Sequence, residues 1–161
     1  MRRLLLVRHA KSSWKFPELS DHDRPLNKRG RRDVPRMAAY LAKRNEPLDA
    51  IYSSSAVRAL AYATQLAEAC EVPLIETSEL YTFSAEKLLS FARNLPESQQ
   101  GVALVSHNPA TEIAIEQLSG QTFNKVPTGA IAAFDYAAPH WQQLAPQQCQ
   151  LDYFMAPKLL P

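Results

Sequence analysis

The sequence predicts an α/β protein in which helices cover the faces of a sheet. Short apolar runs of strand length alternate along the chain with longer segments whose apolar residues recur at helical spacing. The chain has 161 residues, which suits one domain with a sizeable core. We therefore expect a single domain over residues 1–161.

The predicted elements follow from apolar periodicity and from capping residues. In chain order they are a strand over 3–7, a polar loop over 12–26, a helix from 27 to about 44, a strand over 48–55, a helix over 57–70, a short strand within 72–80, a helix over 84–95, a strand over 101–107, a helix over 108–120, a strand over 129–136, two paired segments at 140–145 and 149–154, and an extended tail over 156–161.

The first half of this assignment depends on an apolar run and on caps. Residues 4–7 are all apolar, as in a buried strand. The Asn27 side chain can accept a hydrogen bond from the start of the first helix. Pro35 lies inside that helix and should kink it or mark a later start. Ser54 or Ser55 can cap the second helix.

The second half has similar markers. Ser84 caps the third helix, and Leu88 and Leu89 lie on its inward face. Pro109 stands in the first turn of the fourth helix and Gly120 just past its end, the usual places for these two residues.

Composition and charge exclude several classes of protein. Hydrophobic residues make up 46% and charged residues 21%, which is ordinary for a globular protein. A formal net charge of +2 does not by itself indicate nucleic acid or a membrane surface. The apolar run after Arg3 is shorter than the about 7–15 residues of a secretory signal, and no run approaches the ~20 of a membrane span. We expect a cytoplasmic protein that binds neither nucleic acid nor membrane.

The two cysteines, Cys70 and Cys149, lie far apart and in no metal or redox spacing. Two reduced thiols fit a cytoplasmic protein, while a disulfide is also compatible with the sequence.

Arginine and histidine side chains follow directly on three predicted strands. Arg8 and His9 end the first strand, His107 ends the strand over 101–107, and Arg58 begins the helix after the second strand. If these strands are parallel, all four groups emerge at the carboxyl edge of the sheet, where open α/β sheets bind ligands.

This set of groups suits a phosphoryl ligand. Two guanidinium groups match phosphate oxygens, and nearby helix N-termini add backbone N–H groups. A neutral histidine could attack phosphorus and form a covalent intermediate. The arginines and a second, protonated histidine would then stabilise the charge of the transition state. The scheme needs no metal or cofactor, and His22 and His140 have no metal-ligand spacing. Each residue alone has a simpler structural reading; their convergence predicts an anion site.

Three motifs resemble the histidine phosphatase superfamily, also called phosphoglycerate mutase-like. "VRHAKSSW" resembles its opening R-H-G signature, "SSSAVRA" its second arginine segment and "LVSHNP" its second histidine segment. The short chain, "DHDRPLNKRG" and "PTGAIAAFDY" further resemble the SixA-type phosphohistidine phosphatases, a small branch without large insertions.

The resemblance implies one histidine-phosphatase domain, a three-layer α/β/α sandwich around a six-stranded, mostly parallel sheet. It implies that His9 is the nucleophile and becomes a phosphohistidine. Arg8, Arg58 and His107 would complete the phosphate pocket. His9 would attack through one ring nitrogen while the other donates to a backbone carbonyl.

The proton donor stays open at this point. Larger family members carry a glutamate after the third strand, where this chain has Thr82, with Glu79 near but offset. In the SixA branch the candidate acid is an aspartate before "RPL". Asp21 matches it by spacing, Asp23 could serve instead, and both could simply be loop residues.

Other residues have weaker predictions. Ser12 could donate its hydroxyl to the phosphate or merely close the loop. Lys15, where many relatives have an asparagine, could supply a charge or be a solvated loop lysine. The family's usual Gln-Thr pair after Arg58 is replaced by Ala61 and Tyr62. A basic run could dock an acidic protein or a polyanion, or be a solvated helix face; it consists of Lys28, Arg29, Arg31 and Arg32.

The resemblance thus implies a metal-independent phosphatase that removes phosphate from histidine on a phosphorelay or phosphotransfer protein. The imidazole of a phosphohistidine leaves more readily than an alkoxide, so such a substrate needs less help from a general acid. The alternatives are a phosphatase for small phosphate monoesters and a non-catalytic module that binds a phosphorylated ligand. The sequence identifies neither the partner protein nor the oligomeric state, for which a monomer is the default expectation.

Overall fold

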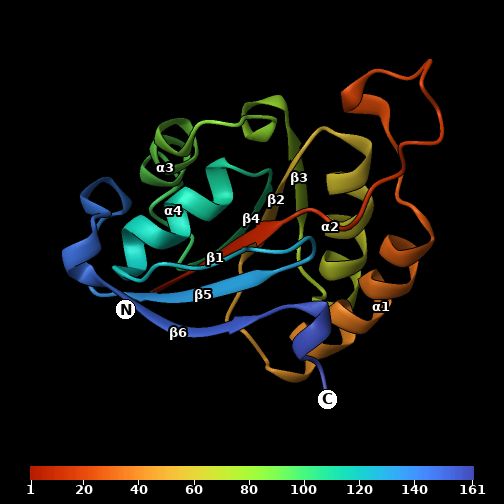
Figure 1. The fold of residues 1–161 in the computed structure, drawn as a ribbon. Helices are drawn as coiled ribbons and strands as arrows, with labels where there is room; N and C mark the ends of the chain where they lie inside the picture. The colour runs from red at the N-terminus through yellow and green to blue at the C-terminus, as the bar shows by residue number, and fades with distance from the viewer.

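The computed structural model describes residues 1–161 as one six-stranded sheet with helices on both faces (Figure 1). The strands are β1 (Arg2–Arg8), β2 (Ala50–Ser54), β3 (Leu74–Thr77), β4 (Gly101–Ser106), β5 (Ile131–Tyr136) and β6 (Cys149–Met155). The helices are α1 (Lys28–Lys43), α2 (Val57–Cys70), α3 (Ala85–Arg93) and α4 (Ala110–Ser119).

The sheet is mostly parallel, as predicted. Its strand order is β3-β2-β4-β1-β5-β6. Strands β3, β2, β4 and β1 pair in parallel, whereas β5 runs antiparallel to both β1 and β6. The carboxyl ends of β1, β2 and β4 therefore lie together at one edge of the sheet, beside the start of α2 (Figure 1).

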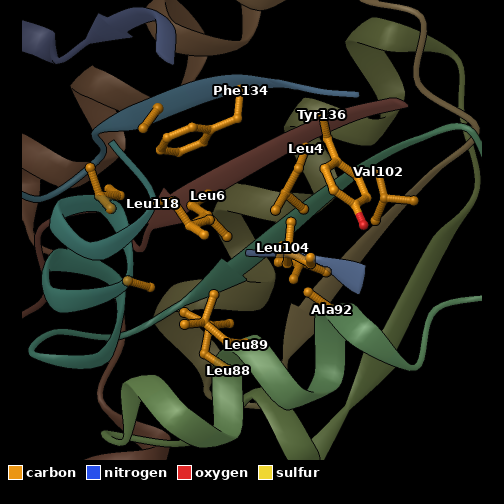
Figure 2. Close-up of a cluster of buried hydrophobic side chains, with 14 of the residues drawn as sticks. Leu4, Leu6, Leu88, Leu89, Ala92, Val102, Leu104, Leu118, Phe134 and Tyr136 are labelled. Carbon is orange, nitrogen blue, oxygen red and sulfur yellow. The ribbon is translucent and has the colours of Figure 1, made fainter. Parts of the chain in front are cut away.

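The side chains of β1 alternate between two hydrophobic clusters, one on each face of the sheet, and this alternation shows the three layers. Leu4 and Leu6 belong to a core cluster shared with α3 and α4, part of which Figure 2 shows. Leu5 and Val7 belong to a second cluster shared with α1 and α2. Since successive side chains of a strand point to opposite faces, a strand covered on both faces reads as one continuous apolar run. The α/β/α sandwich is confirmed.

Helix α1 begins where the sequence predicts. Asn27 is its N-cap, and the side-chain Oδ1 accepts a hydrogen bond from Gly30 N at 2.8 Å. The helix continues through Pro35 without a late start. Gly30 is required by close approach, because a Cβ at this position would lie 2.2 Å from the backbone oxygen of Lys11. This contact fixes the loop that follows β1 against α1.

Two predictions at the C-terminal end are wrong. Residues 140–145 are not a strand: Trp141–Gln143 form a 3-10 turn, and β6 pairs with β5 instead. The turn forms because the Trp141 ring is fully buried and its Nε1–H donates to Gln99 O at 2.9 Å. The tail is not extended either, since Pro157–Leu159 also form a 3-10 turn.

Two further observations bear on the sequence predictions. None of the helices has both the length and the apolar character needed to cross a membrane. Cys70 and Cys149 are half-buried and are not joined to each other.

Candidate active site

A small cavity of about 240 Å³ opens at the carboxyl edge of the sheet. The four groups predicted to converge, Arg8, His9, Arg58 and His107, all line it. The remaining lining residues are Lys11, Ser12, Trp14, Asp21, Arg24, Phe83, Asn108 and Thr128. The parallel register brings the two histidines together, because Arg8 on β1 pairs with Ser106 on β4 and each is followed by a histidine. Their ring centroids lie 5.1 Å apart.

His9 is 7% exposed, and its ring has a defined orientation. Its Nδ1 lies 2.8 Å from the carbonyl oxygen of Ala10. Because a carbonyl oxygen only accepts, Nδ1 carries the proton and Nε2 keeps its lone pair. Burial, with smaller contributions from neighbouring cations, lowers the pKa of His9 to about 3. The ring is therefore neutral at pH 7, and the nitrogen that keeps its lone pair, Nε2, faces Arg58.

His107 is more completely buried and is held by Ser54. Its Nε2 lies 2.7 Å from Ser54 Oγ, while Arg58 Nη2 approaches its Nδ1 at 3.4 Å. Burial first, and then the charge of Arg58, lowers the pKa of His107 to about 3. His107 is therefore neutral at pH 7 without a bound phosphate, and its protonated form in the transition state stays a prediction. An entering phosphate dianion would favour the charged form.

The use of Ser54 explains a difference at the start of α2. The N-cap of this helix is Ala56, without a side-chain cap, and neither Ser54 nor Ser55 takes that place. Ser54 Oγ instead accepts from Ala56 N at 3.1 Å and contacts the imidazole of His107.

Arg58 is the central cation of the cavity and is 2% exposed. Its Nε–H donates to His9 Nε2 at 3.4 Å. Its two terminal nitrogens donate to the backbone oxygen and to the carboxylate of Asp21, at 2.6 and 3.0 Å. One guanidinium thus connects both histidines and the loop after β1, so it sets the distances among them.

Arg8, at the end of β1, also lines the cavity. Its Nη1 donates to the carbonyl of Val126 at 2.9 Å, whereas its buried Nε has no hydrogen-bond partner in the protein. A buried donor without a partner carries a penalty of about 1–3 kcal/mol, which an anion in the cavity would relieve. The position of this N–H supports a phosphate site.

Tyr62 holds the loop over residues 126–129 through a hydrogen bond to its backbone. The hydroxyl of Tyr62 donates to Gly129 O at 2.7 Å, and Gly129 N donates to His9 O at 2.8 Å. Tyr62 occupies the second position of the family's usual Gln-Thr pair. Its fully buried ring supports the pocket without lining it.

Asp21 lies at the cavity, but its carboxyl group is ionised. It accepts from Tyr81 Oη at 2.7 Å and from Arg58, and it pairs with Arg24 at 3.2 Å. Burial alone would raise its pKa, but the hydrogen bonds from Tyr81 and Arg58 outweigh this effect and lower the pKa to about 2. Asp23 does not line the cavity and pairs with His22 at 3.0 Å.

The predicted phosphate contacts of the loop divide into two groups. Ser12 lines the cavity, but Lys15 does not and lies instead in a neighbouring groove. The prediction missed Lys11 and Arg24, which do line it. Arg24 is 7% exposed and its guanidinium stacks 3.5 Å from the centroid of the Trp14 ring. Its position in "DHDRPL" next to the aspartates was the available signal.

The segment after β3 supplies no acid. Thr82 is buried and its Oγ1 accepts from Ser84 N, and Glu79 lies in a separate depression. The residue that reaches the cavity from this segment is Phe83. No group of three or more His, Cys, Asp or Glu side chains is placed to hold a metal ion.

Comparisons with known proteins agree with this arrangement. A sequence model of the histidine phosphatase superfamily (branch 1) matches residues 4–88. An uncharacterized protein of Mycobacterium leprae is 28% identical over 94% of this chain and 100% of its own length. The structure of SixA from Agrobacterium tumefaciens superposes with a TM-score of 0.83 at 29% identity, covering 96% of this chain and 97% of that one. The protein histidine phosphatase SixA complexed with tungstate has the same fold, with a TM-score of 0.79 at 20% identity and 97% of each chain covered.

Proposed function

The chain belongs to the histidine phosphatase superfamily, branch 1, and we propose that it is a SixA-type phosphatase that removes phosphate from phosphohistidine on a protein. In this proposal His9 is the nucleophile, Arg8, Arg58 and His107 bind the phosphoryl group, and the reaction needs no metal. Phosphatase activity follows from membership of the family; the phosphohistidine substrate is the proposal.

The orientation of the His9 ring carries this proposal. The carbonyl of Ala10 holds the proton on Nδ1, and burial keeps the ring neutral, so Nε2 presents a lone pair within a cavity lined by cations. A nucleophile needs this protonation state at neutral pH. A site that only bound phosphate would gain more from a charged imidazole.

The first step transfers the phosphoryl group to His9. Nε2 forms a bond to phosphorus while the bond from phosphorus to the substrate imidazole breaks, and the electron pair leaves with that imidazole. The unpartnered Nε–H of Arg8 and the guanidinium of Arg58 face the charge that spreads over the phosphoryl oxygens. His107 donates to these oxygens once the phosphate has raised its pKa.

The second step returns the enzyme to its starting state. A water molecule attacks phosphorus, the bond to Nε2 breaks, and His9 recovers its lone pair with the proton still on Nδ1. Both protons of that water leave with the product, dihydrogen phosphate, while Asp21 stays ionised and holds Arg58 in place. Inorganic phosphate leaves the cavity.

The ionised state of the Asp21 carboxyl group also favours phosphohistidine over a phosphate ester as the substrate. A carboxyl group with a pKa of about 2 is not a proton donor at neutral pH. An alkoxide leaving group needs such a donor, whereas the imidazole of a phosphohistidine protonated on its second nitrogen departs as a neutral molecule. The small cavity agrees, since it has room for the phosphoryl end of a substrate whose remainder stays outside.

The test is phosphate release in EDTA from a histidine-phosphorylated phosphotransfer protein and from phosphoserine, an alkyl ester, in parallel. We expect rapid release from the phosphoprotein and slow release from the ester, and no turnover of either by His9→Ala. A preference for the ester would favour the alternative, a phosphatase for small monoesters. Full activity of His9→Ala, or activity that EDTA abolishes and added metal restores, would contradict the mechanism.

A further inference from the structure

A basic groove lies next to the phosphate cavity and has no role in the chemistry described above. Its volume is about 850 Å³, and it lies along the loop after β1 and the first turn of α1. Five cationic side chains line it, and no carboxylate does; the cations are Lys15, Lys28, Arg29, Arg31 and Arg32. We call this surface the basic groove.

Only a thin wall separates the basic groove from the cavity. Ser12 and Trp14 line the cavity, whereas Ser13, Lys15 and Phe16 line the groove. The facing segment divides in the same way, with Arg24 in the cavity and Pro25 in the groove, and Ser13 N donates to Pro25 O at 2.8 Å. The cavity and the groove therefore lie on the two sides of one loop, and a protein that covers the mouth of the cavity is large enough to reach across this loop to the groove.

The positive charge of the groove is only partly neutralised within the protein. Lys15, Lys28 and Arg31 have no ion pair, and Arg29 and Arg32 share one buried carboxylate, Asp33, at 3.6 and 3.4 Å. The same carboxylate also pairs with Arg36 at 3.5 Å. The chain has 18 Lys and Arg, so removing these five leaves 13 against 16 Asp and Glu. The groove thus holds a cationic charge that the rest of the chain does not.

This charge is placed against the preference of the helix. Four of the five cations lie at the positive end of the α1 macrodipole, and the first turn contains no acidic residue. A negative charge near a helix N-terminus stabilises the helix by about 0.3–1 kcal/mol, and a positive charge there has the opposite effect. Departures from a local rule are expected at functional surfaces, so the observation agrees with a role in binding.

Three exposed aromatic residues line the cavity or the groove. Trp14 is 75% exposed, Phe83 is 50% exposed and Phe16 is 44% exposed. Aromatic side chains together with arginine are the composition that distinguishes protein–protein interfaces from the remaining surface.

We propose that the basic groove docks an acidic surface of the protein that carries the phosphohistidine. The inference rests on the proposed function and extends it to the partner, which would present carboxylates beside its phosphorylated histidine. Charge complementarity would speed the encounter and orient the histidine toward the cavity. The exposed aromatic residues Trp14, Phe16 and Phe83 favour a folded protein as the partner over a nucleic acid or a small polyanion.

The test compares substrates that share a leaving group but differ in surface. The substrates are an acidic, histidine-phosphorylated phosphotransfer domain and free phosphohistidine, which has no docking surface. The variant is Lys28→Glu with Arg31→Glu, in which glutamates suit the start of a helix. The matched control is Lys43→Glu with Lys87→Glu, the same charge change at two exposed positions outside the groove.

We expect the groove variant to lose about 10–100-fold in kcat/KM for the phosphoprotein, mainly through KM, and to keep its activity on free phosphohistidine. Added salt should lower kcat/KM of the unaltered enzyme for the phosphoprotein and have less effect on the variant. An equal loss on both substrates, no loss on the phosphoprotein, or an equal loss in the control would overturn the proposal. The proposal would also be overturned if fluorescence anisotropy showed that the unaltered enzyme binds single-stranded DNA with a lower Kd than the phosphoprotein.

Failure of docking and failure of the proposed function are distinguishable in this design. If the enzyme does not act on phosphohistidine, the unaltered chain releases no phosphate from either substrate. If only the docking inference fails, the unaltered chain acts on both substrates, and the groove variant loses no more activity on the phosphoprotein than on free phosphohistidine or than the control variant loses.

Discussion

Asp21→Asn separates a positioning role of this carboxylate from proton donation. The substitution removes the charge that pairs with Arg58 at 3.0 Å and with Arg24 at 3.2 Å, but it leaves the backbone oxygen that also holds Arg58. A fall in pKa from 3.8 to about 2 corresponds to about 2.4 kcal/mol of favourable interaction in the folded state. Because the Asp21 side chain is 44% exposed, solvent screening reduces this to about 1 kcal/mol.

The stability effect has a defined pH dependence. A depressed carboxyl pKa stabilises the folded protein above pH 3.8, and the contribution is lost as the pH falls through about 2. We expect Asp21→Asn to lower the free energy of unfolding by about 1 kcal/mol at pH 7, measured by urea denaturation, and to differ less from the unaltered protein near pH 3. Asp23→Asn is the matched control, since Asp23 lies two residues away and outside the cavity.

The kinetic effect distinguishes the two roles. Loosening Arg58 should reduce kcat by about tenfold for both phosphoprotein and ester, with an unchanged pH profile. A general acid would contribute about 10²–10⁴-fold, and its removal would abolish the basic limb of the profile. A loss in that range, confined to the ester or accompanied by a changed basic limb, would refute the reasoning.

Two further predictions concern buried groups of the site, and a third concerns Gly30, which packs against the loop after β1. Burial lowers the pKa of His9 and His107 to about 3, so unfolding should become easier as the pH falls from 6.5, by up to about 1.4 kcal/mol per pH unit for each histidine; urea denaturation of His9→Asn should show a shallower dependence, and equal slopes would contradict the assignment. Ser54→Ala leaves Nε2 of His107 without its hydrogen-bond partner at 2.7 Å and should cost about 1–3 kcal/mol of stability, with a lower kcat; a stability within error of the unaltered protein would show that the hydrogen bond is unimportant. Gly30→Ala should destabilise by about 1–2 kcal/mol despite the higher helix propensity of alanine, because its Cβ would meet the backbone oxygen of Lys11; a gain in thermal stability would mean that the loop after β1 yields easily.

The residues at strand ends could be predicted because local pattern and sheet geometry together determine where they lie. An apolar run followed by Arg8 and His9, and another followed by His107, place their side chains at one edge once the strands are parallel. The α/β/α layers follow from the same runs, since strands that are apolar at every position need a cover on both faces.

The supporting residues could not be predicted, because their roles depend on contacts between distant segments. Ser54 looks like a helix cap in the sequence, yet it contacts His107, which lies 53 positions later. In the loop after β1, an isolated antiparallel β-bridge pairs Ser12 with Leu26. Some side chains of this loop line the cavity and others line the groove. No periodic pattern in the loop indicates this register, so the sequence alone does not show that Lys15 lies in the groove and Arg24 in the cavity.

The pairing at the C-terminal end shows a different limit. The pattern of residues 149–154 predicts a strand correctly but does not say which strand it pairs with. Burial of the Trp141 ring, with its hydrogen bond to Gln99 O, turns the preceding segment into a short 3-10 turn and leaves β5 as the neighbour.

The most direct test of the account is to trap the covalent intermediate and locate the phosphate. The enzyme would be mixed with the histidine-phosphorylated phosphotransfer domain, quenched in alkali within the first turnover, digested and mapped by mass spectrometry, with the modified nitrogen assigned by NMR. We predict phosphate on Nε2 of His9, since Nδ1 is held by the carbonyl of Ala10, and none in His9→Ala. Phosphate on another residue, or turnover by His9→Ala at the rate of the unaltered enzyme, would contradict the central claim.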